Sequence, residues 1–331
     1  MRRSALLMVL VMLAGTVPGD EKPAAPRIYA YADLYSGTVH LVRDGTAVDS
    51  MPGDYPAFTS TGRFLVTSTR EKIFAMDVTT GAVHERALTF LAPAGCQVSR
   101  SLVGDEVMLV APTLRRFRLP DLTEAGPVAA ALPARLPGCV LGEAGGDVIV
   151  LVSNRSGRQI HRVDADGTTR QVGPEPLTPP GSHSAPADIL LTVAAGARLA
   201  YLEDNAAVVH VLDLETGVDT VPSTAALGGP GPAVEMFVED MWWSSAGVLH
   251  AMIQTEELGE EYRLCRVAGG AWEPVPTGDW EYVRDRPGGG RLFVERSRPY
   301  GLYEDGPGGT RLIAESVSGI VTPPPSGPFA Q

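Results

Sequence analysis

Charged residues recur at one point of a repeating pattern, where a short apolar strand begins after a turn. Arginine offers bidentate contacts to carboxylate or phosphate groups. If each residue opens the innermost strand of its unit, the side chains can ring one mouth of a central channel and bind an anionic or zwitterionic small molecule. The alternative is that each charge is solvated or paired within its own unit. The six candidates are Arg27, Arg63, Glu106, Asp147, Arg198 and Arg291.

A second candidate lies in the segment 239–243, Glu-Asp-Met-Trp-Trp, in a chain that has only 4 Trp. Tryptophan is enriched at recognition hot spots, so Asp240, Trp242 and Trp243 form a candidate interaction surface. A large aromatic residue can also fill the wedge between two packed sheets. Side chains alternate along a strand, so we expect the two indoles to point to opposite faces.

Motifs that would carry catalysis are absent from the sequence. It contains no GxSxG elbow, HExxH pair, P-loop or EF-hand loop. Three histidines, His40, His161 and His210, share a strand position with Phe74 and Phe117 of other units. A position shared with phenylalanine indicates packing between sheets. We therefore expect no catalytic residue, no metal ion and no cofactor.

The chain has 3 cysteines, and Cys96 and Cys139 lie one repeat length apart. A disulfide between them is possible in an oxidising compartment. Free or buried thiols are the alternative. There is no CxxC motif or Cys/His cluster, so no zinc site is expected.

Composition excludes several classes of protein. Of 331 residues, 44% are hydrophobic, 37 are Gly and 28 are Pro, which fits a turn-rich chain with a sizeable core. The formal net charge is −12. An acidic chain repels phosphate backbones, so we expect no nucleic-acid partner.

The N-terminus has the pattern of a secretory signal peptide. Arg2 and Arg3 precede an apolar run over residues 5–14, and small and turn-forming residues follow. The run is shorter than the roughly 20 residues that a membrane span needs, although an uncleaved anchor is the alternative. Cleavage after Thr16 or after Gly19 fits the pattern, and we take 1–19 as the signal. We expect a secreted or cell-envelope protein that is not an integral membrane protein.

The rest of the chain repeats a three-strand pattern, most clearly over residues 55–89. Strands are expected at 63–67, 72–77 and 82–88. Asp77 and Gly81 bound a tight turn, because Asp can accept hydrogen bonds from the backbone ahead of it and Gly tolerates a positive φ. A fourth strand, such as 56–58, 96–99 or 237–243, precedes each turn.

Seven such units follow one another at spacings of 36 to 51 residues, counted between their opening residues. This period is typical of the blades of a β-propeller, roughly 40–50 residues each. We therefore expect an all-β fold, most simply seven four-stranded blades in a single domain over 20–321. Strands near 311–314 and 319–321 close the ring, and 322–331 is a Pro-rich tail. Residues 173–187 and 222–234 are expected to be exposed loops.

The segments Pro56-Ala-Phe-Thr-Ser-Thr-Gly62 and Ile73-Phe-Ala-Met-Asp-Val-Thr-Thr-Gly81 resemble the TolB-type, WD-repeat-like propeller repeat of bacterial periplasmic and exported proteins. The copy at 196–217 is similar in its second half. The Ser-Pro-Asp-Gly turn of that repeat is replaced here by Thr59-Ser-Thr-Gly62. The resemblance implies a propeller fold, an exported location and contacts with proteins or peptides. The family shares no catalytic residues.

Two functions are consistent with the sequence. The first is an exported, non-enzymatic scaffold that binds a protein, a peptide or a cell-envelope component. The alternative is a propeller enzyme, such as a lyase, lactonase or hydrolase, with its site at the mouth of the central channel, because one fold hosts many activities. The sequence leaves the oligomeric state open.

Overall fold

The computed structural model describes residues 27–88, 105–111, 113–127, 136–144, 147–154, 157–164, 166–172, 191–193, 197–203, 208–227, 236–244, 247–255, 263–276, 280–285, 290–295, 300–306 and 309–323. These residues form antiparallel strands with tight turns and one 3-10 helix at Ala225–Leu227. The predicted signal peptide and most of the tail lie outside them. No helix among the described residues is long and apolar enough to cross a membrane.

Hydrogen bonds join the described strands into seven sheets, which we number as blades in chain order. Blade 1 consists of β27 (Val317–Val321), β1 (Ile28–Asp33), β2 (Thr38–Arg43) and β3 (Thr46–Pro52). Blade 2 consists of β4 (Asp54–Phe58), β5 (Phe64–Ser68), β6 (Lys72–Asp77) and β7 (Val83–Ala87). Blade 3 has three described strands, β8 (Glu106–Ala111), β9 (Thr113–Arg118) and β10 (Thr123–Pro127).

The other four blades each have four strands in sequence order. Blade 4 consists of β11 (Leu136–Ala144), β12 (Asp147–Asn154), β13 (Gly157–Val163) and β14 (Thr169–Val172). Blade 5 consists of β15 (Leu191–Val193), β16 (Arg198–Glu203), β17 (Val208–Asp213) and β18 (Asp219–Thr220). Blade 6 consists of β19 (Met236–Trp243), β20 (Leu249–Thr255), β21 (Arg263–Ala268) and β22 (Ala271–Pro274). Blade 7 consists of β23 (Trp280–Asp285), β24 (Arg291–Glu295), β25 (Leu302–Gly306) and β26 (Gly309–Ala314).

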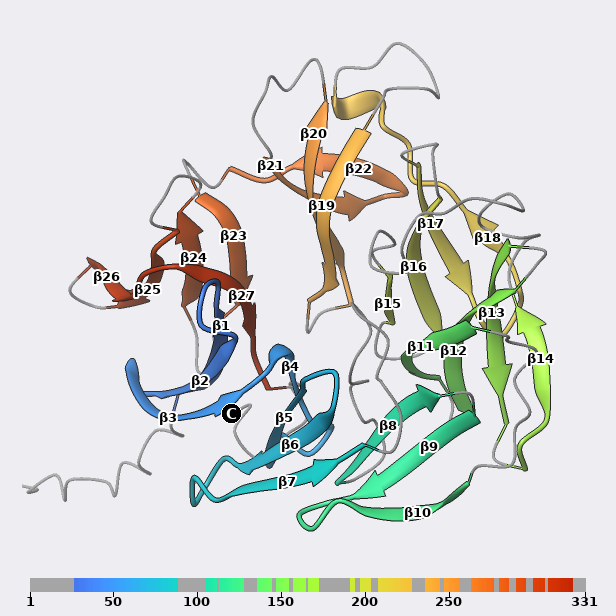
Figure 1. Cartoon of the computed structure of the whole chain (residues 1–331). Helices are drawn as coiled ribbons and strands as arrows, with labels where there is room; N and C mark the ends of the chain where they lie inside the picture. The colour runs from blue at the N-terminus through green and yellow to red at the C-terminus, as the bar shows by residue number, and fades with distance from the viewer. Residues whose placement is uncertain are drawn as a thin grey trace, which may run out of the picture.

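The blades follow one another around a ring, with the first strand of each meander turned inward (Figure 1). Neighbouring first strands contact one another, as β4 does with β27, and β15 does with both β11 and β19. The all-β propeller class is therefore confirmed. The count of seven four-stranded blades stays a prediction, because 96–99, the expected fourth strand next to blade 3, lies outside the described residues.

The ring closes between the two ends of the chain. Strand β27 pairs with β1, and Tyr31 faces Ile320 in that register. The C-terminal strand thus completes the first blade, as the sequence predicts for 319–321, whereas the prediction for 311–314 is wrong because this segment lies in β26, the edge strand of blade 7. Closure also involves charge, because the buried carboxylate of Glu304 in blade 7 lies 3.4 Å from Arg27 Nη1 and 3.1 Å from Arg311 Nη2. Closure of the ring removes the exposed sheet edges that would otherwise remain at the two ends of the chain.

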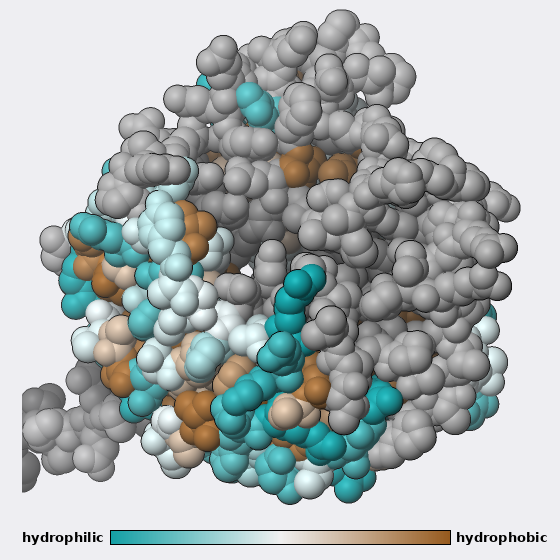
Figure 2. Space-filling view, in the orientation of Figure 1, coloured by the Kyte–Doolittle hydropathy of each residue, from teal (hydrophilic) through white to brown (hydrophobic). Residues whose placement is uncertain are grey.

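The core lies between blades rather than in one central mass. Both faces of the middle strands are buried, so β5 and β6 read as continuous apolar runs. Leu65 and Met76 pack toward blade 1, whereas Phe64 and Val66 pack toward blade 3. The surface is more polar, and teal hydrophilic side chains dominate the part of the face over β6, β7 and β9 (Figure 2).

The tight turn between Asp77 and Gly81 forms as the sequence predicts. Asp77 Oδ1 accepts hydrogen bonds from the amides of Thr79 and Thr80, and Gly81 has a φ of 75°. Burial disfavours ionisation of Asp77, but the amides of Thr80 and Thr79 together with Arg63 outweigh it and lower the pKa of the carboxyl. The turn after Asp213 repeats this arrangement.

Candidate functional site

Five of the six charged candidates do not open the innermost strands, and this part of the expectation is wrong for them; Glu106 opens β8, the first described strand of blade 3. In each four-stranded sheet they precede or begin the second strand, which pairs with a first strand that lies nearer the axis. The first strands, such as β4 and β19, are the segments that the sequence assigned as the last strand of the preceding unit. The five residues concerned are Arg27, Arg63, Asp147, Arg198 and Arg291.

The six residues also occupy two different positions in the register. The carbonyls of Arg27 and Arg63 accept hydrogen bonds from the residues that follow the next strand. In blades 3 and 5 the same bond goes to Asp105 and Ala197. Glu106 and Arg198 therefore stand one residue further along their strands. A shift of one residue sends a side chain to the opposite face of a sheet.

Most of these charged side chains form salt bridges with nearby residues of opposite charge. Arg63 Nε lies 3.4 Å from Asp77 Oδ2, and Arg291 Nε lies 3.6 Å from Asp305 Oδ2. The remaining pairs among the described residues are Arg63 with Asp105, Arg27 with Asp44 and Glu304, Glu106 with Arg116 and Arg118, and Asp147 with Arg162. These pairs favour the structural alternative for five of the six positions.

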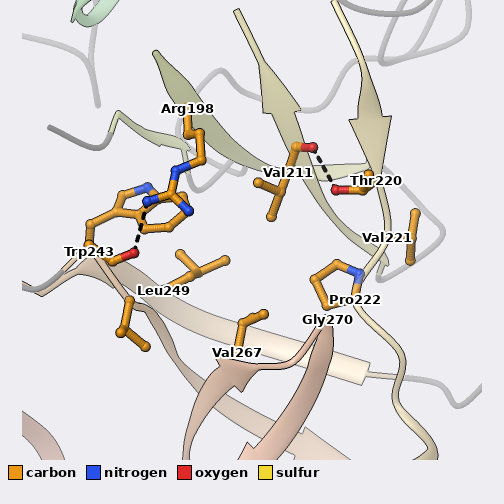
Figure 3. Close-up of a pocket in the computed structure, with 11 residues that line it drawn as sticks. Arg198, Val211, Thr220, Val221, Pro222, Trp243, Leu249, Val267 and Gly270 are labelled. Carbon is orange, nitrogen blue, oxygen red and sulfur yellow. Dashed lines mark hydrogen bonds between the residues drawn. The ribbon is translucent and has the colours of Figure 1, made fainter. Parts of the chain in front are cut away.

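Arg198 departs from this arrangement. It faces Asp213 in the register of β16 and β17 and acts on that carboxylate electrostatically, but it forms no salt bridge with a carboxylate of the described residues. Its guanidinium instead reaches blade 6, where it lies 4.7 Å from the centre of the Trp243 ring and donates from Nη2 to the Gly247 carbonyl at 3.0 Å. The cation–π contact fixes the plane of the guanidinium. Figure 3 shows Arg198 stacked over Trp243 at one end of a pocket.

The two adjacent tryptophans point to opposite sides of blade 6, as alternation predicts. Trp243 packs in the cluster between blades 5 and 6. Trp242 packs toward blade 7 with Phe293, and its ring stacks on that of His250 with centroids 5.6 Å apart. The side chain of Asp240 lies outside the described part of the chain. Of the candidate interaction surface, Trp243 is thus the residue that contacts one of the six charged candidates, Arg198.

The pocket between blades 5 and 6 has a volume of about 280 Å³. Its walls are mostly aliphatic, and hydrophobic atoms are visible beside β21 and β22 in Figure 2. The only charged side chain among its lining residues is that of Arg198. The lining comprises Arg198, Val211, Thr220, Val221, Pro222, Trp243, Gly247, Val248, Leu249, Val267 and Gly270.

One wall of the pocket comes from a segment that the sequence assigned to an exposed loop. Ser223 pairs with Ala271, its amide donates to the Gly270 carbonyl, and Leu227 is 1% exposed. The described part of 222–234 therefore lies against blade 6 instead of extending into solvent. Trp272, which is fully buried, fills the wedge that the sequence analysis attributed to Trp242 or Trp243.

The histidines of the shared strand position stack on or pack among neighbours. His40 stacks on Tyr31 and His210 on Tyr201, each with ring centroids 4.9 Å apart. His210 Nδ1 lies 2.6 Å from Asp219 Oδ2, which also accepts a hydrogen bond from Tyr201 Oη at 3.1 Å. In the part of the chain that the structure describes, no group of three or more His, Cys, Asp or Glu side chains is placed to hold a metal ion.

The predicted Cys96–Cys139 disulfide is not tested, because Cys96 and the side chain of Cys139 lie outside the described residues. Cys265 is a buried free thiol in blade 6. Burial raises the pKa of this thiol to about 12, against the opposing charge of Arg263. It is therefore a packing residue in the blade 5–6 core.

Comparisons with known proteins agree with the fold. No family model and no curated protein sequence matches the chain. A functionally unknown protein from Desulfotomaculum acetoxidans is similar over 89% of this chain and 98% of its own, with TM-score 0.54 and 10% identity. A protein from Lactobacillus plantarum is similar over 90% and 97%, with TM-score 0.51 and 11% identity.

Two further solved structures are similar to the chain. Dihydro-heme d1 dehydrogenase NirN is similar over 89% of this chain and 75% of its own, with TM-score 0.52 and 13% identity. TolB from Acinetobacter baumannii is similar over 77% and 64%, with TM-score 0.46 and 16% identity. At these identities the likeness extends to the fold alone, and membership of the TolB-type family is not established. The chain is a β-propeller with a largely apolar pocket between blades 5 and 6, at one end of which Arg198 lies over Trp243.

Proposed function

We propose that this chain is an exported, TolB-like β-propeller that acts as a non-enzymatic binding scaffold for a protein or peptide. The Arg198–Trp243 pocket is its docking site. The observation that carries the proposal is the arrangement of Arg198, which bridges from blade 5 to Trp243 and Gly247 of blade 6 and forms no salt bridge with Asp213.

Three features support binding at this pocket. Tryptophan and arginine are the side chains most enriched at binding hot spots. An apolar cavity with a few directed polar groups is the usual form of a ligand site. Val221, at the rim, is 53% exposed, so the cavity is continuous with the surface. The predicted signal peptide at 1–19 supports export to the compartment in which the partner would be met.

Affinity capture with matched variants tests the proposal. The chain from Asp20 onward is immobilised in wild-type form, as Arg198→Gln and as Arg291→Gln, and exposed to cell-envelope and culture-medium extracts. Arg291 is the matched control because it opens the second strand of blade 7 and is paired with Asp305. We expect the same proteins to be retained by the wild type and Arg291→Gln and lost with Arg198→Gln.

Equal retention by all three forms would exclude the pocket as the docking site. Metal analysis and small-molecule analysis of the purified wild type complete the test. A stoichiometric metal or bound small molecule without a protein partner would favour the enzyme alternative at the channel mouth.

A further inference from the structure

The geometry of Arg198 leaves donors available inside the pocket. A guanidinium carries five N–H groups in one plane, and the described contacts of Arg198 use one nitrogen, Nη2, toward the Gly247 carbonyl. Stacking on Trp243 covers one face of the group. The acceptor that completes this arrangement lies in the guanidinium plane. A carboxylate matches it best, because its two oxygens can accept two parallel hydrogen bonds.

The aliphatic lining of the rest of the cavity favours a ligand with an apolar group next to that acceptor. Val211, Leu249 and Val267 line the cavity between the Arg198–Trp243 stack and Pro222 in Figure 3. The Thr220 hydroxyl is already used, because it donates to the Val211 carbonyl at 3.1 Å. With so few free polar groups, a sugar or another polyhydroxylated ligand would leave its own hydroxyls unpaired.

Size limits what can enter. The volume of about 280 Å³ falls just below the range of about 300–1,000 Å³ for sites that enclose drug-sized ligands. The pocket therefore suits one terminal residue rather than a whole cofactor. A free molecule this small makes few contacts and gains little affinity. A peptide can add contacts outside the pocket.

The surface beside the pocket provides such contacts. Val218 and Val221 flank β18 and are 56% and 53% exposed, respectively. Val218 lies two residues before Thr220, so both side chains are on the face of the strand that looks toward blade 6. An extended peptide with its last side chain in the cavity could lay its preceding apolar residue along this rim.

The charge of the pocket favours a carboxylate over a phosphate group as the ligand. The pocket presents one cation, and the chain as a whole has a formal net charge of −12. A phosphate monoester carries up to two negative charges at neutral pH and would be only half neutralised by one arginine. Because Arg198 also acts on the Asp213 carboxylate opposite it, the smaller charge of a single carboxylate suits the pocket better than that of a phosphate group.

Resting on the proposed docking function, we propose that the pocket recognises the free C-terminus of a partner peptide. The terminal carboxylate pairs with Arg198, and an aliphatic last side chain contacts Val211, Leu249 and Val267. Capture of a C-terminal carboxylate is an established form of peptide recognition. Here it would be achieved by a stacked arginine instead of a backbone loop.

Fluorescence polarisation with a pair of matched probes tests this inference. The probes are fluorescein-labelled Gly-Ser-Gly-Ser-Val-Leu with a free C-terminus and the same peptide with a C-terminal amide. We expect the amide to bind about 10- to 100-fold more weakly, the range for loss of a charge-assisted hydrogen bond. Arg198→Gln should abolish the difference between the probes, whereas Arg291→Gln should preserve it.

A second variant guards against a folding defect. Arg198→Lys keeps the charge but loses the planar fork and its stacking, so it should bind the free acid more weakly than the wild type while unfolding at a similar urea concentration. Equal binding of acid and amide, both dependent on Arg198, would overturn the carboxylate inference and leave the docking function intact. If neither probe binds but capture from envelope extracts still depends on Arg198, the carboxylate inference is likewise overturned and the docking function stands. Envelope capture that is independent of Arg198 would contradict the docking function itself.

Discussion

The guanidinium of Arg198 lies over the indole of Trp243 in the next blade, with 4.7 Å between the guanidinium carbon and the ring centre. Arg198 also stands directly opposite Asp213 in its own blade and acts on its carboxylate electrostatically, but the two are not joined by a salt bridge. The Asp213 carboxylate instead accepts hydrogen bonds from the amides of Glu215 and Thr216 in its own turn. Arg198 is thereby available to join two blades and to cap the cavity between them.

Loss of the buried carboxylate at the ring closure should destabilise the protein. Glu304 is 2% exposed and lies between Arg27 and Arg311. Glu304→Gln removes the carboxylate that Arg311 and Arg27 share and leaves Arg27 with Asp44 alone, and we expect a loss of about 2–3 kcal/mol in the free energy of unfolding. That value is at or below the low end for buried pairs, because both arginines are partly exposed. Urea unfolding followed by circular dichroism measures the change.

The control for this prediction is a surface pair in blade 2. Lys72 Nζ lies 2.8 Å from Glu85 Oε1, and both side chains are largely exposed. Lys72→Gln should therefore cost no more than about 0.5 kcal/mol. Equal effects of the two substitutions would mean that Glu304 does not hold the ring closed.

Acid should weaken the hairpin of blade 2 through Asp77. The pKa of this carboxyl is lowered in the folded protein, whereas an unfolded chain has a value of about 3.9. The group therefore stabilises the fold fully above the unfolded value, and its contribution disappears as the pH falls through the folded value. Asp77→Asn should lower stability at pH 6.

Below the unfolded pKa of Asp77, the wild type and Asp77→Asn should converge. Urea unfolding of both proteins between pH 6 and pH 3 gives the comparison. A difference in stability that stays constant over this range would show that ionisation of Asp77 does not contribute.

Cys265 should be unreactive until the protein unfolds. Its pKa is raised to about 12 by burial, and only the thiolate reacts with alkylating reagents. In a Cys96→Ser/Cys139→Ser background, we expect iodoacetamide at pH 8 to modify the native protein about 1,000-fold more slowly than the protein in urea. Similar rates would indicate that the core between blades 5 and 6 opens readily.

Much of the fold was predictable because the strands of one blade are close in sequence. The expected strand 72–77 coincides with β6, and the Asp77–Gly81 turn forms as the residue types indicate. The first strand of each blade was assigned to the preceding unit. Before β15 and β19 the connection is long, and β15 is only three residues long, so its apolar pattern does not reveal its partner.

The candidate site was predictable only as separate residues. Arg198 and Trp243 were singled out for different reasons, and no sequence pattern places them together, because their contact crosses from one blade to the next. The alignment of repeats also placed Arg198 with Arg63, whereas the register sets them one residue apart. That single step directs Arg198 toward blade 6. The sequence did not single out Trp272 as the tryptophan that fills the space between blades 5 and 6. The adjacent pair Trp242 and Trp243 was the stronger pattern.

Photo-crosslinking in cells tests the central claim most directly. A photo-reactive amino acid is placed at Val221 on the pocket rim or at Leu312 in blade 7, which are 53% and 46% exposed. We predict a discrete protein adduct from position 221 that disappears with Arg198→Gln, and no such adduct from position 312. Adducts of equal yield at both positions, or an adduct from position 221 that survives Arg198→Gln, would contradict a docking site between blades 5 and 6.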